Sequence, residues 1–214
     1  MTQSNFLQAL AGTHLCAITD RHLSGISHAK QVALLSDGGA KLIQLREKFN
    51  TPAGFFVQAE EALRVARDLG VRIIINDRVD IALALGADGV HLGQDDLAPD
   101  AARRILGSKA IVGFSTHNLE QARRAKEMPL DYVAIGPIFA TQTKQTANPP
   151  VGLDGLARVR DVVGPMPLVA IGGITSANIH ATLAAGADAA AVIGDIWEST
   201  PDAPAKTRRL LSVS

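Results

Sequence analysis

Short apolar runs recur along the whole of the 214-residue chain, each separated from the next by a longer amphipathic segment. Eight such runs occupy residues 15–19, 42–45, 72–75, 89–92, 111–114, 132–136, 168–171 and 189–193. Most of them lack the polar alternation of a strand with one face in water, so they predict parallel strands covered on both faces. Eight strand–helix units in series fit either a closed barrel or an open doubly wound sheet.

The segments between the runs have helical spacing. In the clearest one, Thr51 and Pro52 are expected to start a helix as its N-cap and first-turn residue. The apolar stripe of this helix consists of Phe55, Ala59, Leu63, Ala66 and Leu69. Glycine follows several helices directly before a strand, as in 85–89 (LGADG) and 185–189 (AGADA), where a left-handed residue ends the helix.

The equal size of the eight units decides between the two architectures. No Gly-x-Gly-x-x-Gly fingerprint follows the first apolar run, and no linker, charge run or low-complexity tract divides the chain. We therefore predict an α/β fold in which residues 1–214 form a single-domain (β/α)8 TIM barrel.

Composition excludes some classes of partner. Lys and Arg number 21, as do Asp and Glu, so no global positive field draws the chain to nucleic acid. The absence of a long apolar stretch argues against a membrane partner. The single cysteine, Cys16, indicates a reducing compartment, and we expect a cytoplasmic protein. A homo-oligomer is compatible with the sequence.

Polar residues follow the second apolar run, at the end of a barrel strand where such folds place their chemistry. Alternation sends Gln44, Arg46 and Lys48 to one side, so that two cations and an amide converge on one anion. The alternative is a solvated strand end, with Glu47 paired to either cation.

Carboxylates follow the third and fourth runs. Asp77 and Asp96 could share a divalent cation such as Mg²⁺, which takes one or two carboxylates plus water and phosphate oxygens. The alternative is that Asp77, Asp95 or Asp96 caps the next helix. His91 is expected to support the site as a satisfied polar residue behind it.

Later strand ends add hydroxyls and glycines. Ser115 follows the fifth run and is expected to bind phosphate, with helix capping as the alternative and Asn118 as a second candidate cap. Segment 137–153 contains Thr141-Gln142-Thr143-Lys144 and is expected to form a lid over an anion. Glycines after the seventh and eighth runs, Gly172-Gly173 and Gly194, free backbone N–H groups for a phosphate, unless they serve only tight turns.

These motifs jointly resemble the thiamine phosphate synthase family. They are 44–48 (QLREK), Asn76-Asp77, 91–96 (HLGQDD), 113–117 (GFSTH), 136–144 (GPIFATQTK) and 172–175 (GGIT), in the order of the family. The resemblance covers about residues 15–197. It implies a Mg²⁺-dependent transferase of thiamine biosynthesis that condenses 4-amino-2-methyl-5-(diphosphooxymethyl)pyrimidine with a thiazole phosphate, giving thiamine phosphate and pyrophosphate.

The resemblance also implies roles for individual residues. Asp77 and Asp96 would hold Mg²⁺, and Arg46, Lys48 and Lys144 would be the catalytic cations. Substrate binding would involve Gln44, Leu45, Arg46, Glu47, Lys48, Asn76, Ser115, Thr141, Gln142, Thr143, Lys144, Gly173, Ile193 and Gly194. The chain departs from the family at Ala140, where proline is common, and at Gly194, where serine is common. The second change removes a hydroxyl but keeps a backbone donor.

Three other functions share parts of this inventory. A thiazole tautomerase-like paralogue would keep the glycines but lose the pyrophosphate cations. A sugar-phosphate isomerase or epimerase would need a pair of groups placed for proton abstraction. A non-catalytic protein that binds thiamine precursors would use the same residues as the enzyme.

Overall fold

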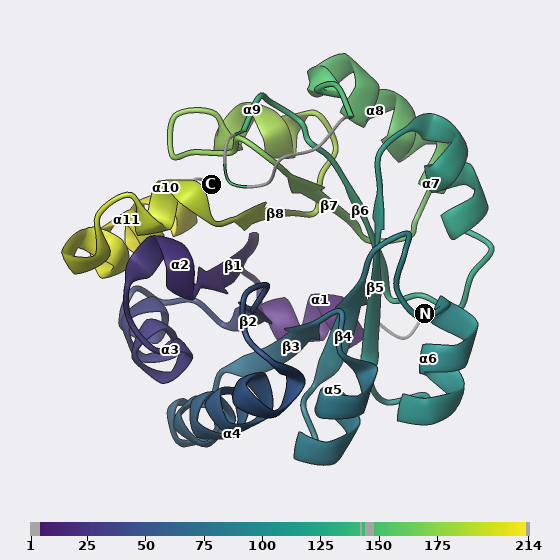
Figure 1. Cartoon of the computed structure of the whole chain (residues 1–214). Helices are drawn as coiled ribbons and strands as arrows, with labels where there is room; N and C mark the ends of the chain where they lie inside the picture. The colour runs from purple at the N-terminus through teal and green to yellow at the C-terminus, as the bar shows by residue number, and fades with distance from the viewer. Residues whose placement is uncertain (1–4, 142, 144–147, 213–214) are drawn as a thin grey trace.

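The chain forms a closed barrel of eight parallel strands ringed by helices (Figure 1). The computed structural model describes residues 5–141, 143 and 148–212. The strands are β1 (Leu15–Asp20), β2 (Leu42–Arg46), β3 (Arg72–Asn76), β4 (Gly89–Leu92), β5 (Ile111–Thr116), β6 (Tyr132–Ile135), β7 (Leu168–Ile171) and β8 (Ala189–Val192). They pair in chain order, and β1 closes on β8 with Leu15 opposite Ala190. The predicted (β/α)8 barrel is confirmed, and the doubly wound alternative is wrong.

Helices cover the outside of the barrel (Figure 1). They are α1 (Asn5–Leu10), α2 (Arg21–Ser24), α3 (His28–Asp37), α4 (Pro52–Leu69), α5 (Val79–Leu85), α6 (Pro99–Leu106), α7 (Leu119–Ala125), α8 (Gly152–Val163), α9 (Ile179–Ala184), α10 (Gly194–Trp197), the 3₁₀ turn η1 (Thr200–Asp202) and α11 (Ala203–Leu211). Of the helices that the structure describes, none combines the length and apolar character needed to cross a membrane.

Helix α4 begins as its sequence predicts. Thr51 accepts a hydrogen bond from the Gly54 amide and Pro52 occupies the first turn. Its predicted apolar stripe is wrong at Leu69, which is 47% exposed. The stripe also omits Ala62, which is fully buried. Leu69 is the last helical residue, and the left-handed Gly70 that follows ends the helix before β3.

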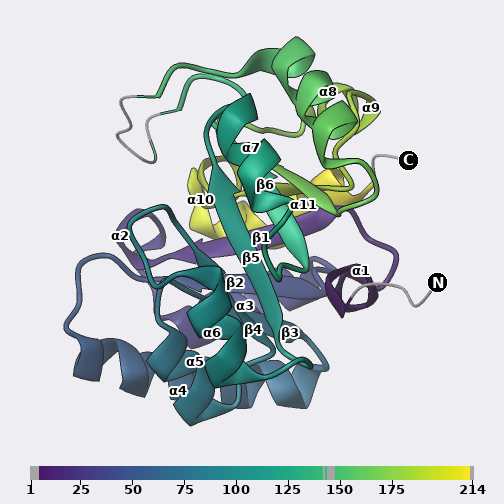
Figure 2. The same ribbon diagram turned by 90° about the vertical axis from the view of Figure 1, so that its right-hand side faces the viewer.

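The barrel interior is filled by its own core, separate from the apolar layer between strands and helices. Helix α1 closes the end where the strands begin (Figure 2), with Phe6 stacked on Tyr132 at 4.1 Å between ring centroids. Gly113 makes room for Tyr132, because a Cβ there would lie 2.0 Å from the Tyr132 Cζ atom. Above it, the Tyr132 hydroxyl lies 2.8 Å from His91 Nδ1. The interior is therefore a packed column that begins at α1.

An aspartate directly before each of β4, β6 and β8 ties neighbouring strands together. Each accepts a hydrogen bond from the amide of the preceding strand, at 2.7–2.9 Å, in the pairs Asp88–Ile73, Asp131–Val112 and Asp188–Leu168. Gly86 and Gly186, two residues before the first and last of these aspartates, have positive φ and end their helices as expected. These contacts help to fix the register, and with it the heights at which the strands end.

Candidate functional site

A pocket of about 730 Å³ opens at the carboxyl ends of the strands. It brings together residues from both halves of the chain that the sequence marks as site residues: Gln44, Arg46, Lys48, Asn76, Asp77, Asp96, Ser115, Thr141, Thr143, Gly173, Ile193 and Gly194. Gln142 and Lys144 lie outside the described residues. A smaller hollow of about 420 Å³ lies near the amino end of β3, between α4 and α5, and contains none of these residues.

Both cations of the 44–48 motif are paired with a carboxylate at or just beyond the end of a neighbouring strand. Arg46 forms an ion pair with Asp20 at the end of β1, and their side chains are 13% and 6% exposed. Lys48 forms an ion pair with Asp77, just after β3. The pocket therefore has two cations held by counter-ions at one side, which we call its charged side.

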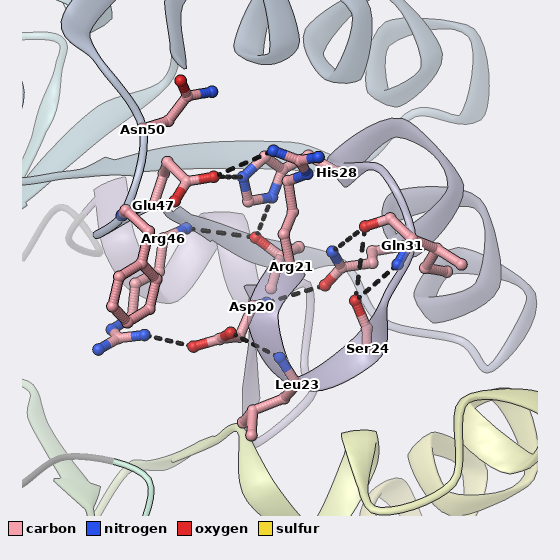
Figure 3. A network of polar contacts seen from close by, with 12 residues as sticks. Asp20, Arg21, Leu23, Ser24, His28, Gln31, Arg46, Glu47 and Asn50 are labelled. Carbon is pink, nitrogen blue, oxygen red and sulfur yellow. Dashed lines mark hydrogen bonds and ion pairs between the residues drawn. The ribbon is translucent and has the colours of Figure 1, made fainter. Parts of the chain in front are cut away.

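Two residues of the β2 motif, Leu45 and Glu47, face away from the pocket. Leu45 is fully buried in the outer core. Glu47 approaches Arg21 at 3.5 Å and His28 at 3.6 Å instead of either predicted cation (Figure 3). The alternation of side chains along a strand causes both differences. The prediction that these side chains bind substrate, and the alternative in which Glu47 pairs with Arg46 or Lys48, are corrected.

Asp77 and Asp96 face each other across the ends of β3 and β4. Burial, followed by the neighbouring Asp77 carboxylate, raises the pKa of Asp96, while a hydrogen bond from the Gly93 amide to Asp96 (2.7 Å) opposes this. The capping alternative is wrong, because Arg78 and Ala98 are the N-caps of α5 and α6. Asp77 has a φ of +64°, a backbone conformation that residues other than glycine rarely adopt.

The donor set fits a magnesium ion shared with a ligand. In the described part of the chain, no three His, Cys, Asp or Glu side chains gather closely enough to form a protein-only metal cage. Two carboxylates, Asp77 and Asp96, are nevertheless what Mg²⁺ commonly takes from a protein when phosphate oxygens and water complete its octahedron.

Ser115 lies on the pocket floor at the top of the interior column. Its hydroxyl lies 2.8 Å from His91 Nε2, and its carbonyl accepts a hydrogen bond from Gln94 at 2.6 Å. His91 thus contacts Ser115 on one side and Tyr132 on the other, as a satisfied supporting residue. Asn118, not Ser115, caps α7, so the capping alternative for Ser115 is wrong.

Across the pocket, the ends of β7 and β8 form a rim of backbone, which we call the glycine side. Gly172 and Gly173 have φ values of +100° and +65°. A Cβ on Gly173 would lie 2.6 Å from the Ala140 carbonyl oxygen, so this glycine serves close approach as well as a turn. At Gly194 a Cβ would lie 2.9 Å from the Thr143 hydroxyl. The rim thus has no room for a side chain at either position, because neighbouring residues of the 139–143 segment approach it closely.

Sequence reasoning missed two carboxylates at the site. Asp20 follows the first apolar run directly, so the rule applied to the later runs would have found it. Asp195 lines the glycine side and accepts a hydrogen bond from the Ser176 amide at 3.3 Å. Asp195 could have been found from its position directly after Gly194, at the end of the eighth apolar run.

Comparison with known proteins gives one consistent result. Residues 15–196 match the family model of thiamine monophosphate synthase. A thiamine-phosphate synthase from Chloroflexus aurantiacus is 45% identical over 92% of this chain and 90% of its own, and one from Pelotomaculum thermopropionicum is 40% identical over 100% and 97%. The solved thiamine phosphate pyrophosphorylase from Pyrococcus furiosus superposes with a TM-score of 0.84 at 32% identity, over 94% of this chain and 95% of its own.

Proposed function

The chain belongs to the thiamine monophosphate synthase family, and from that premise we propose that it joins an aminopyrimidine methyl diphosphate to a thiazole phosphate. The thiazole nitrogen forms a bond to the pyrimidine methylene carbon, and the bond from that carbon to the diphosphate oxygen breaks. The products are thiamine phosphate and pyrophosphate. The observation that carries this proposal is a single pocket with paired cations and carboxylates at one side and a glycine rim at the other.

The charged side is proposed to hold the diphosphate. An aminopyrimidine can stabilise positive charge at its methylene carbon, so no covalent nucleophile is required of the protein. Arg46 and Lys48 stabilise the negative charge that grows on the leaving pyrophosphate, and the paired Asp20 and Asp77 hold them in place beforehand. Lys144 is proposed to join them.

Asp77 and Asp96 are the proposed ligands of Mg²⁺, which would supply further neutralisation of the leaving diphosphate. Gln44, Asn76 and Ser115 line the pocket beside the cations and are proposed to bind the pyrimidine substrate.

The glycine side is proposed to hold the thiazole phosphate. Backbone N–H groups near Gly173 and Gly194 are suited to a phosphate, because neither glycine has a side chain of its own to shield its amide. Thr141, Thr143 and Ile193 line this part of the pocket, and Gln142 is proposed to join them. Together, the two sides would align the thiazole nitrogen with the methylene carbon.

The arrangement favours this proposal over its alternatives. A thiazole tautomerase has no need for Arg46 and Lys48 beside two carboxylates, yet both cations line the pocket. An isomerase or epimerase needs acid–base groups near the phosphate, where the structure has a glycine rim with Asp195 alone among its lining carboxylates in the described residues. A cytoplasmic setting is part of the proposal, supported by the single cysteine of the sequence, which cannot form an intrachain disulfide.

One incubation separates the alternatives. Purified protein is mixed with the pyrimidine diphosphate, the thiazole phosphate and MgCl₂, and products are followed by chromatography and mass. Formation of thiamine phosphate with an equal amount of pyrophosphate is expected. Binding of both compounds without product would indicate a sensor, and conversion of the thiazole alone would indicate a tautomerase; either result contradicts the proposal.

A further inference from the structure

Behind the charged side of the pocket, a buried set of polar groups joins β1, α3 and the residue after β2. Its members are Thr19, His28 and Glu47, of which Figure 3 labels His28 and Glu47. Thr19 and His28 are fully buried, and the Glu47 side chain is 5% exposed. Burial makes the hydrogen bonds that this set does form costly to lose.

The Thr19 hydroxyl is the centre of this set. It accepts a hydrogen bond from the Arg46 amide at 3.2 Å. Its own single proton can go to His28 Nδ1, at 2.8 Å, or to the Gln44 carbonyl oxygen, at 3.4 Å. The shorter distance favours donation to the imidazole.

That donation fixes the tautomer of His28. With Nδ1 as acceptor, the ring proton is on Nε2, which faces Glu47 Oε2 at 3.6 Å, an electrostatic contact longer than a hydrogen bond. The opposite tautomer would point a lone pair at a carboxylate, so charge favours the same assignment. Burial, opposed by Glu47 and aided by Arg21, lowers the pKa of His28 to about 4, so the ring is neutral at neutral pH.

Glu47 connects this set to the backbone of the residues that follow β2. Its Oε1 atom accepts a hydrogen bond from the Phe49 amide at 2.9 Å. The two ends of the set therefore hold the amides of Arg46 and Phe49, which lie on either side of the segment that presents Arg46 and Lys48 to the pocket.

We propose that Thr19, His28 and Glu47 are positioning residues for the two cations of the charged side. The directed series runs from the Arg46 amide through Thr19 and His28 to Glu47, and it holds the backbone on which Arg46 and Lys48 are mounted. This proposal rests on the proposed function. It gives Glu47 a role in the β2 motif that involves neither substrate contact nor an ion pair with either cation.

Two substitutions at Thr19 test the proposal as a matched pair. Thr19→Val keeps the shape and removes the hydroxyl, whereas Thr19→Ser keeps the hydroxyl. Thr19→Val is expected to lower kcat about 10- to 100-fold, the usual effect of misplacing catalytic groups slightly, and to leave the KM for the thiazole phosphate unchanged. Thr19→Ser is expected to restore kcat to within about threefold of the wild type.

The thermal midpoint of each variant separates positioning from plain stability. If Thr19→Val unfolds at a lower temperature but its kcat equals that of Thr19→Ser, the hydroxyl only stabilises the fold and the proposal is overturned. Should Thr19→Val fail to fold, Glu47→Gln takes its place, because it keeps the side-chain volume while removing the charge that faces His28. A loss of kcat of about tenfold is expected there, and unchanged kcat would overturn the proposal.

A binding measurement makes the test independent of turnover. Calorimetry is used to measure the affinity for inorganic pyrophosphate in the presence of MgCl₂. Thr19→Val is expected to weaken this binding and to leave binding of the thiazole phosphate intact. If the wild type makes no thiamine phosphate but this selective loss is seen, the proposed function fails and the positioning role stands. Equal pyrophosphate affinity in Thr19→Val and wild type contradicts the positioning role.

Discussion

The charged side and the glycine side of the pocket prepare for anions in opposite ways. On the charged side, Arg46 and Lys48 are held by carboxylates of neighbouring strands, so an anion must compete with counter-ions already in place. On the glycine side, backbone conformation defines the shape of the pocket. A side chain at Gly173 would collide with the 139–140 segment. The first arrangement depends on charge and the second on shape. Perturbations of charge and of volume should therefore act on different substrates.

Removal of divalent metal should have the largest effect and act on the charged side alone. Excess EDTA is expected to abolish turnover and MgCl₂ to restore it, because Asp77 and Asp96 are the proposed ligands. Calorimetry should show thiazole phosphate binding preserved in EDTA. Turnover without metal would contradict the role of the two carboxylates.

Loss of one cation should have the next largest effect. Lys48→Met is expected to lower kcat by about 10²–10³-fold, the usual result of removing one preorganised group that stabilises developing charge. Lys41→Met is the control, since Lys41 is an exposed lysine at the opposite end of β2. Steady-state kinetics with saturating substrates measures both, and a kcat for Lys48→Met equal to that of the control would refute the assignment.

A methyl group on the glycine side should mainly weaken binding of the thiazole phosphate. Gly173→Ala places a Cβ 2.6 Å from a carbonyl oxygen at a φ of +65°, and its KM for that substrate is expected to rise at least about tenfold. Gly70→Ala has a matching φ of +66° but open space around it, so it reproduces the backbone strain without the collision. If both variants bind the thiazole phosphate equally well, shape is not what defines this side.

Beside its positioning role, His28 should make a smaller, pH-dependent contribution to stability. The unfolded chain binds a proton at His28 below about pH 6.5, whereas the folded chain does so only below about pH 4. Stability from the neutral ring is fully present above pH 6.5 and is lost as the pH falls toward 4, by about 3 kcal/mol at most.

Urea unfolding at pH 7, 5.5 and 4.5 measures this contribution. His28→Gln is expected to lose less stability than the wild type across this range, because it removes the group that must charge on unfolding. His180→Gln, a change at an exposed histidine, should retain the wild-type pH dependence. Parallel pH dependence in His28→Gln and wild type would contradict the buried neutral state.

The barrel could be predicted from sequence because its signal is periodic and local. Each apolar run became a strand, and strand ends in a parallel barrel meet at one rim whatever the loops do. Residue identities therefore sufficed to gather most of the pocket wall, including Asp77, Ser115 and Gly194.

Partner choice could not be predicted in the same way. The ion pair of Arg46 with Asp20, rather than with Glu47, depends on strand alternation and on which carboxylate of a neighbouring strand reaches the guanidinium. His28 had no partner pattern in the sequence, because Thr19 and Glu47 come from separate strands and meet it only in the closed barrel. The prediction of a buried Leu69 was wrong because apolar spacing does not show where the packed part of a helix ends.

The interior column under Ser115 has a consequence for how such barrels can diverge. Tyr132 occupies the volume that Gly113 leaves open, and it also joins Phe6 of α1 to His91 beneath the pocket. A side chain at 113 therefore requires a smaller residue at 132, and that replacement would remove the hydroxyl that contacts His91. Divergence at position 113 is thus coupled to position 132, far below the rim.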